Sequence, residues 1–151
     1  MTVGKEINLL RNYPQSKRDV SGRLDVKTKE DQRIAQKFGK EFFDGSRNHG
    51  YGGFSYSPRF WQPVIPTFQK HWSLTGGDSL LDIGCAKGFM LHDLKQLIPD
   101  IIVHGVDISK YAIDNAKNEV KRYCKVSNAT ELPFDDKSID VCISVTTLHN
   151  L

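Results

Sequence analysis

The second half of the chain alternates between two kinds of segment, and this order limits its fold more than any other feature. From residue 78 onward, short apolar runs alternate with stretches of helical periodicity. The apolar runs are DSLLDIG, IIVHGVDI, a short run at 123–126 and IDVCISV. Strands that alternate with helices predict a parallel sheet built from right-handed βαβ units. We therefore expect an α/β fold over residues 76–151, with helices on both faces of the sheet.

The turn after the first apolar run has the features of a ligand-binding loop. The strand carries Asp82 near its end, and Gly84, Ala86 and Gly88 follow at alternate positions before a helix. Small residues let the backbone turn sharply and let a ligand approach it closely. The helix start presents free N–H groups that suit a carboxylate or a phosphate. Open α/β sheets bind ligands at this end of their strands, although a tight turn without a ligand is the alternative.

The glycine spacing distinguishes two cofactor classes. A dinucleotide site needs Gly-x-Gly-x-x-Gly, which would require a third glycine where Phe89 stands. A bulky ring at that position disfavours a nicotinamide-dependent oxidoreductase. The pattern Asp-x-Gly-x-Gly-x-Gly fits better, with Ala86 in place of its middle glycine.

Polar residues also end the second and third apolar runs. Asp107 follows about 20 residues after the first loop, where a carboxylate can accept both hydroxyls of a ribose. Ile108 would then lie against an adenine face, and Asn128 and the Ala129 N–H could contact the adenine edge. The alternatives are that Asp107 assists Ser109 in capping a helix, and that Asn128 begins an ordinary crossover loop.

These segments, in this order, resemble those of class I S-adenosylmethionine-dependent methyltransferases. The motifs are LLDIGCAKGF, VDIS, NATELPFDDKSIDV and ISVTTLHNL, and the resemblance covers residues 76–151. It implies a Rossmann-like sheet with strand order 3-2-1-4 in the part present, and S-adenosyl-L-methionine as cofactor. The third motif has the form common among small-molecule members, which implies a small-molecule methyl acceptor.

The resemblance also assigns the cofactor contacts. Gly84 and Gly88 would wrap the methionine part, and Ser144 would lie near the methionine amino group. Asp82 would orient that loop, or reach the amino group through water. The full set of implied contacts in this half is Asp82, Gly84, Cys85, Gly88, Asp107, Ile108, Asn128, Ala129 and Ser144. The methyl group on Ala86 is the smallest possible departure from the family pattern.

One histidine is placed for proton transfer. His149 follows the fourth strand, near where the methyl group should point, and an imidazole suits a general base. A surface or packing role is the alternative for this side chain. Cys85 and Cys142 lie in apolar elements without a visible activating base, so we expect both thiols to pack rather than react.

The N-terminal half divides into two zones. Residues 1–27 are polar and basic and predict a loose arm. Residues 28–75 predict a helical, aromatic segment: Ile34, Phe38 and Phe42 share one face of a helix over residues 31–43. A second helix should contain Val64, Ile65, Phe68 and Trp72 on its buried face and end at Gly76–Gly77.

Between these two helices lies a glycine-rich aromatic loop, DGSRNHGYGGFSYSP. Four glycines make it mobile, and its aromatic side chains could stack on a ligand. N-terminal segments of the resembling family often act as lids, so we expect Tyr51 to close over the cofactor. The alternative is that these rings pack against the preceding helix.

Composition excludes several other classes. The net charge of +3 and the pI near 8.7 permit nucleic-acid binding without arguing for it. Three cysteines without a Cys-x-x-Cys pair argue against a metal site or a disulfide framework and favour a reducing compartment. No apolar run approaches the roughly 20 residues of a membrane span, and the N-terminus has no signal-like apolar region. We therefore expect a cytoplasmic protein.

Three functional alternatives remain open beside the small-molecule methyltransferase. The basic arm (Arg11, Lys17, Arg18, Arg23) could contact RNA phosphates, and a protein acceptor is also compatible. A non-catalytic S-adenosylmethionine-binding fragment is the third. The family sheet has seven strands and this chain stops after the fourth, so we expect it to be the front part of a longer protein, with its own activity in question.

Overall fold

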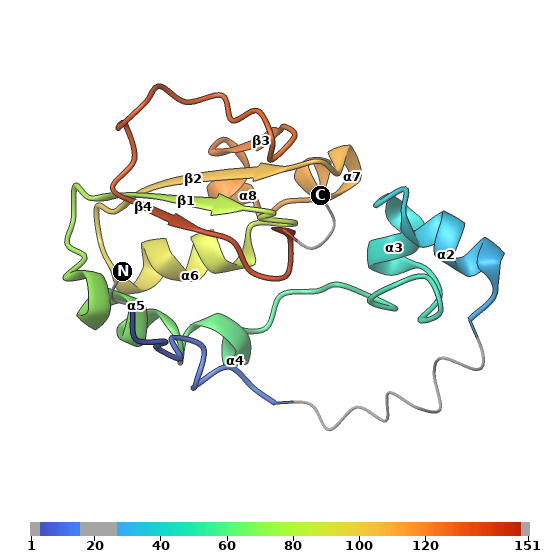
Figure 1. Ribbon diagram of the computed structural model, residues 1–151, viewed down its shortest axis with the longest axis horizontal. Coiled ribbons are helices and arrows are strands. Elements are labelled where there is room, and N and C mark those ends of the chain that lie inside the picture. Colours follow the sequence, from blue (N-terminus) through green and yellow to red (C-terminus); the bar gives the residue numbers. More distant parts are fainter. Residues whose placement is uncertain (1–3, 16–26, 149–151) are drawn as a thin grey trace.

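The chain folds around a four-stranded parallel sheet (Figure 1). The computed structural model describes residues 4–15 and 27–148. The strand order is β3-β2-β1-β4, which confirms the predicted order. The strands are β1 (Ser79–Ile83), β2 (Ile102–Asp107), β3 (Cys124–Val126) and β4 (Val141–Ile143).

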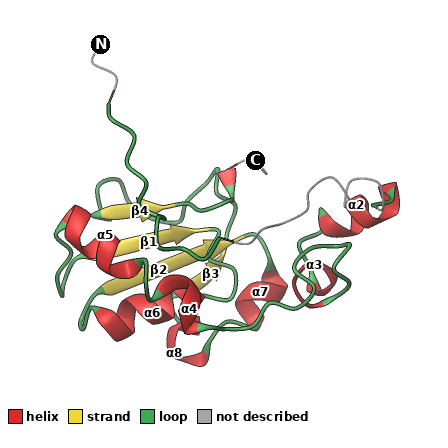
Figure 2. Cartoon of the chain, turned by 90° about the horizontal axis from the view of Figure 1, so that it is seen from below, coloured by secondary structure: helices red, strands yellow, loops and turns green. Residues whose placement is uncertain are grey.

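Short helices surround this sheet. They are α2 (Lys29–Ala35), α3 (Lys40–Asp44), α4 (Pro58–Trp61), α5 (Ile65–Trp72), α6 (Phe89–Leu97), α7 (Lys110–Asp114) and α8 (Asn118–Lys121). Helix α6 runs along one side of the sheet with α4, α5 and α8 against it, and the crossover from β3 to β4 arches over the other side (Figures 1 and 2). Helices α2 and α3 lie beyond the ends toward which the strands point.

The core lies between the sheet and α6. Leu80 of β1 and Leu91 and Leu94 of α6 are fully buried, and Phe68 of α5 closes the cluster at 2% exposure. Gly105 of β2 gives α6 room to approach, because a Cβ there would lie 2.7 Å from the Leu91 side chain. Burying apolar side chains in this way is the main driving force for folding. The half of the chain with the strongest sequence pattern therefore supplies most of the core, and α5 completes it.

The first predicted helix is broken in two. Residues 31–43 do not form one helix: α2 ends at Ala35 and α3 begins at Lys40. Phe38 has a φ of 48°, and Gly39 is the extended N-cap of α3. The predicted apolar stripe is nevertheless held together, because the Phe38 and Phe42 rings meet edge to face at 5.1 Å.

Two other expectations also need correction. Helix α5 ends at Trp72, because Ser73 adopts a left-handed conformation with φ of 52°, and not at Gly76–Gly77. Cys142 is exposed rather than packed in the interior, whereas Cys85 and Cys124 are buried. A strand with an apolar sequence can expose one face, so its hydrophobicity alone did not determine the environment of this thiol.

Candidate functional site

The 84–88 loop turns back on itself at the carboxyl end of β1. The N–H groups of Gly84 and Cys85 both donate to the Val106 carbonyl, at 2.7 and 3.0 Å. The N–H of Gly88 donates to the Cys85 carbonyl at 2.8 Å and closes the turn before α6. Gly84 and Gly88 have φ values of 88° and 72°, so both positions require the freedom of glycine.

Ala86 shares this left-handed geometry. Its φ is 49°, in a region that costs an L-residue with a Cβ roughly 1 kcal/mol or more. Ala86 thus adds only a methyl group to the family pattern, but its backbone conformation is strained. The strain is offset by a hydrogen bond, because the Ala86 N–H donates to Asp107 Oδ2 at 2.8 Å.

Asp107 connects this loop to the next strand. Its Oδ2 accepts from Ala86 and its Oδ1 accepts from the Ser109 N–H, also at 2.8 Å. Burial raises the pKa of Asp107 above its ordinary value, although these two hydrogen bonds oppose the shift. A carboxylate offers about four lone-pair directions, and the hydrogen bonds that Asp107 accepts within the described residues use two of them. The structure brings Asp107 and the 84–88 loop together. It also fits the alternative role of Asp107, because this carboxylate accepts from the N–H of Ser109, the N-cap of α7.

Asp82 lies beneath the same loop. It pairs with Gly105 on one side and Ile143 on the other, and its exposed fraction is 6%. Burial, together with the negative charge of Asp107, raises the pKa of Asp82 to about 7. A cation placed near these two carboxylates would favour their charged forms and so lower both pKa values.

The segment after β4 reaches the loop from the other side. Ser144 follows Ile143, and its buried Oγ makes no hydrogen bond within the described residues. Three residues later, Thr147 covers Gly84, since a Cβ at Gly84 would lie 1.9 Å from the Thr147 hydroxyl oxygen. Ser144 thus offers an unused polar atom in the neighbourhood predicted for the methionine amino group. His149, the predicted general base, lies outside the described residues.

The predicted adenine contacts follow the ends of β2 and β3. Asp107 pairs with Val126, so Ile108 and Asn128 begin adjacent loops. The Ile108 side chain is 58% exposed at this edge of the sheet. Asn128 is exposed and its Oδ1 accepts from the Thr130 N–H at 3.0 Å, while Ala129 is half-buried.

Residues 42–57, named here the aromatic segment, approach the site from the N-terminal half. The Tyr51 ring lies 4.4 Å from Phe54 and 5.8 Å from Phe43. Phe54 in turn stacks on Phe89, the first residue of α6, at 4.9 Å and 19°. The rings therefore do pack against the preceding helix, as the alternative interpretation held, and the same packing brings them to the helix start beside the 84–88 loop.

Sequence reasoning missed one charged residue in the loop itself. Lys87 is only 8% exposed, and its ammonium group lies 2.7 Å from Asp44 of the aromatic segment. A lysine among small residues was the available signal, but its partner is more than forty positions away. No local pattern could have revealed that pair.

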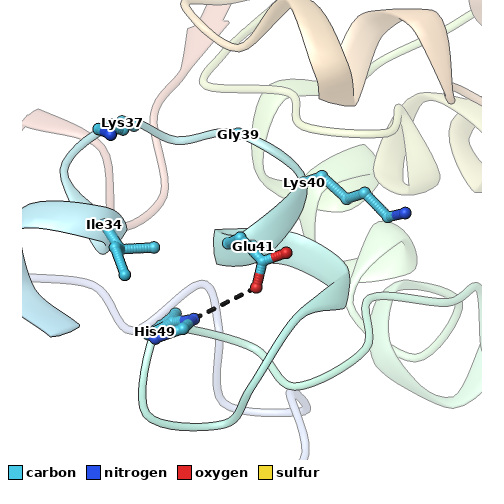
Figure 3. Close-up of a pocket in the computed structure, with 6 residues that line it drawn as sticks. All are labelled: Ile34, Lys37, Gly39, Lys40, Glu41 and His49. Atoms are coloured by element: carbon cyan, nitrogen blue, oxygen red, sulfur yellow. Dashed lines mark ion pairs between the residues drawn. The ribbon is translucent and has the colours of Figure 1, made fainter.

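A separate hollow of about 350 Å³ lies between α2 and α3 (Figure 3). In it, His49 has Nε2 3.1 Å from Asp31 and Nδ1 3.4 Å from Glu41. This hollow is distinct from the site described above, and its lining residues are Ile34, Lys37, Gly39, Lys40, Glu41 and His49.

Two further searches covered residues 4–15 and 27–148. Within them, no group of three or more His, Cys, Asp and Glu side chains is arranged to hold a metal ion. The same residues include no helix with the length and apolarity needed to cross a membrane.

Comparisons with known proteins match the half of the chain that contains this site. Residues 81–151 match the profile of the family described as "Methyltransferase domain". Demethylmenaquinone methyltransferase of Tropheryma whipplei is 31% identical over 85 residues, covering 54% of this chain and 35% of that protein. The 27-O-demethylrifamycin SV methyltransferase of Amycolatopsis mediterranei is also 31% identical, covering 52% and 31%. The chain thus spans about a third of the length of these two relatives.

Solved structures show the same fold. Phosphoethanolamine N-methyltransferase 2 of Haemonchus contortus superposes with a TM-score of 0.55 at 22% identity, over 86% of this chain and 29% of that one. Geranyl diphosphate C-methyltransferase of Streptomyces coelicolor gives 0.51 at 18% identity, over 82% and 56%. These likenesses show the fold, and the matched profile together with the strand order identifies residues 81–151 as part of a class I S-adenosylmethionine-dependent methyltransferase domain.

Proposed function

We propose that this chain binds S-adenosyl-L-methionine at the carboxyl ends of β1, β2 and β3 and serves methyl transfer to a small-molecule acceptor. One observation carries the proposal: the Asp107 carboxylate joins the left-handed 84–88 loop to the end of β2, and its hydrogen bonds within the described residues use two of its lone-pair directions. The acceptor class is supported by the names of two relatives, which refer to menaquinone and rifamycin chemistry. The family match supports the cofactor.

The residues present fit the cofactor chemically. Asp107 would accept the ribose hydroxyls, and the exposed Ile108 side chain would cover one face of the adenine. Asn128 and the Ala129 N–H would contact the base edge. On the methionine side, Gly84, Cys85 and Gly88 would supply backbone surface. Asp82 would attract the amino group, and Ser144 would use its Oγ there, which makes no hydrogen bond within the described residues.

The chemistry required of the protein is mainly positioning. Bound S-adenosylmethionine supplies an activated methyl group on a sulfonium. The chain must hold that group in line with the attacking atom and exclude water. We propose that Tyr51 and its neighbouring rings form the water-excluding cover, and that His149 receives a proton where the acceptor must lose one.

The proposal also includes a division of the chain and a location. We propose residues 1–27 as an arm, 28–75 as the covering segment and 76–151 as the cofactor-binding part. A cytoplasmic location is supported by Cys85 and Cys124, which are both buried free cysteines.

Calorimetric titration with S-adenosylhomocysteine tests the cofactor site. We expect micromolar binding by the chain, and a loss of at least about tenfold in Asp107→Ala, because each charge-assisted hydrogen bond contributes about 1.5–3 kcal/mol. Asp114→Ala is the matched control: it removes an exposed aspartate of α7 that pairs with Lys110. Circular dichroism on each variant shows whether it is folded. A folded chain that does not bind, or an Asp107→Ala variant that binds as well as the control, would contradict the proposal.

Tyr51→Ala tests the cover. We expect weaker binding of S-adenosylhomocysteine and lower turnover, because the ring packs on Phe54 at the edge of the site. If affinity and turnover both stay unchanged, Tyr51 is not part of the cover.

A further inference from the structure

Asp44 is the centre of a hydrogen-bond network that joins four parts of the chain. Its Oδ2 accepts from Lys87 Nζ and from the Tyr111 hydroxyl, each at 2.7 Å. Its Oδ1 accepts from the Phe54 N–H at 2.9 Å. Burial opposes the charged form, but the hydrogen bonds from Lys87, Phe54 and Tyr111 outweigh it and lower the pKa of Asp44 to about 2. Asp44 is therefore a carboxylate at any pH near neutrality.

Lys87 is the matching cation, and it belongs to the 84–88 loop. Its Nζ also donates to the Phe54 carbonyl at 2.8 Å, so both of its acceptors lie on the aromatic segment. The rings of Phe54 and Tyr111 lie 5.9 and 5.8 Å from the ammonium group. A buried ammonium group is strongly unfavourable unless it is paired and hydrogen-bonded. The burial of Lys87 therefore depends on the aromatic segment staying in place.

The backbone of Lys87 is held as well. Its carbonyl accepts from the Lys117 N–H at 3.0 Å, which connects the loop to the chain that precedes α8. Its two neighbours, Ala86 and Gly88, both have left-handed backbones. An anchored side chain between them restrains the loop in this left-handed shape.

From this geometry we propose that Lys87, Asp44 and Tyr111 form a latch that fastens the aromatic segment to the 84–88 loop. The latch makes Lys87 and Asp44 positioning residues: they hold the loop and its cover in the arrangement that receives the cofactor, without touching the cofactor themselves. The effect on cofactor binding rests on the proposed function. The fastening of the segment does not, because it follows from the network alone.

Hydrogen exchange of the full chain without ligand tests the fastening. The amides of residues 45–57 are compared in wild type, Asp44→Asn, Lys87→Met and the double variant. We expect exchange there to rise at least about tenfold in each single variant, and by less than the product of the two single effects in the double variant, because both changes break the Lys87–Asp44 contact. Exchange in β1 and α6 should stay unchanged, which also shows that each variant is folded.

The Lys110–Asp114 pair provides a matched control. It is an exposed ion pair of the same two residue types, with side chains 77% and 54% exposed. Lys110→Met and Asp114→Asn should leave exchange in residues 45–57 as in wild type. If either latch variant fails to fold, Tyr111→Phe removes one hydrogen bond without leaving a buried charge and should raise exchange by a few-fold. Unchanged exchange in folded latch variants, or additive effects in the double variant, would overturn the latch.

Binding of S-adenosylhomocysteine to the same variants tests the positioning role. We expect about a tenfold weaker Kd in Lys87→Met, partial recovery in Lys87→Arg, which keeps the charge, and no change in Lys110→Met. Faster exchange with an unchanged Kd would overturn positioning. Failure of wild type to bind would instead reject the proposed function and, with it, the positioning role, while the exchange result would still decide whether the segment is latched.

Discussion

The sheet with α6 and the N-terminal part with α2 and α3 are held together by different forces. In the first, Leu80, Leu91 and Leu94 are fully buried, and strands and helix interlock through them. In the second, every residue of α2 is partly or fully exposed, and Phe43 is the buried residue of α3. Aromatic edges and a polar network hold that part against the sheet. The two parts therefore differ in how much apolar side chain they bury, and the N-terminal part has far less of it.

A core truncation gives the largest expected difference between the two parts. Leu91→Ala should lower the free energy of unfolding by about 4 kcal/mol, because it removes a fully buried side chain and leaves a cavity. Ile34→Ala, at a half-exposed position on α2, should lower it by less than about 1 kcal/mol. Urea denaturation followed by circular dichroism measures both. Equal losses would mean that α2 and the sheet form a single cooperative core.

Substitution of two glycines with nearly the same φ allows the cost of backbone strain to be measured apart from the cost of a steric clash. Gly84 and Gly77 have φ values of 88° and 93°, but a Cβ at Gly77 meets nothing within 4 Å, whereas one at Gly84 collides with Thr147. Gly77→Ala should therefore lower the free energy of unfolding by about 1 kcal/mol, and Gly84→Ala by about 3 kcal/mol. Thermal unfolding of the two variants measures the difference. Losses of similar size would show that the segment after β4 yields freely to the new methyl group.

The sequence predicted the scaffold well because its signals are local. Each strand is a short apolar run that ends at a glycine or a polar residue, and the order of these runs determines the parallel topology. The position of Asp107 beside the 84–88 loop follows from the same topology, since parallel strands bring their carboxyl ends to one edge. That part of the site could be placed without coordinates.

Other features of the structure could not be predicted from local sequence patterns. The helix break at Phe38 depends on a non-glycine residue in a left-handed conformation, which periodicity does not reveal. The pairing of Lys87 with Asp44 joins residues from different segments through a tertiary contact. The apolar alternation of β4 likewise did not show that Cys142 faces outward. Sequence patterns report local preference, and these three features are set by tertiary packing.

Deprotonation of Asp82 gives the third comparison, because it weakens the sheet without touching the N-terminal part. Its pKa in the folded chain is about 7, against 3.8 for the free side chain. The folded state therefore binds more protons than the unfolded state between pH 4 and 7, so stability falls as the pH rises through that window. From pH 5 to pH 8 we expect a loss of about 2.5 kcal/mol from this group. Asp82→Asn should flatten that dependence in urea titrations, and an unchanged slope would contradict the assignment.

The ligand should respond to pH in the opposite direction. If Asp82 attracts the amino group of S-adenosylhomocysteine, its charged form is required, and binding below pH 7 must release a proton. Affinity should then rise with pH by up to about tenfold per unit below pH 7 and level off above it. Calorimetry at pH 6 in two buffers of different ionisation enthalpy counts the released proton. Proton uptake, or no proton change, would rule out this role for Asp82.

The smallest expected effect lies at the contact between α2 and α3. His49 contacts Asp31 of α2 and Glu41 of α3, and its side chain is only 16% exposed. His49→Ala should raise hydrogen exchange in residues 29–35 by about two- to fivefold, because partly exposed ion pairs contribute little. Global unfolding and S-adenosylhomocysteine affinity should stay as in wild type, since the latch at Asp44 does not involve this contact. His71→Ala, an exposed histidine of α5, is the control and should change none of the three. A loss of affinity in His49→Ala would mean that α2 takes part in holding the cover closed, and the boundary between the two parts would then lie further toward the N-terminus.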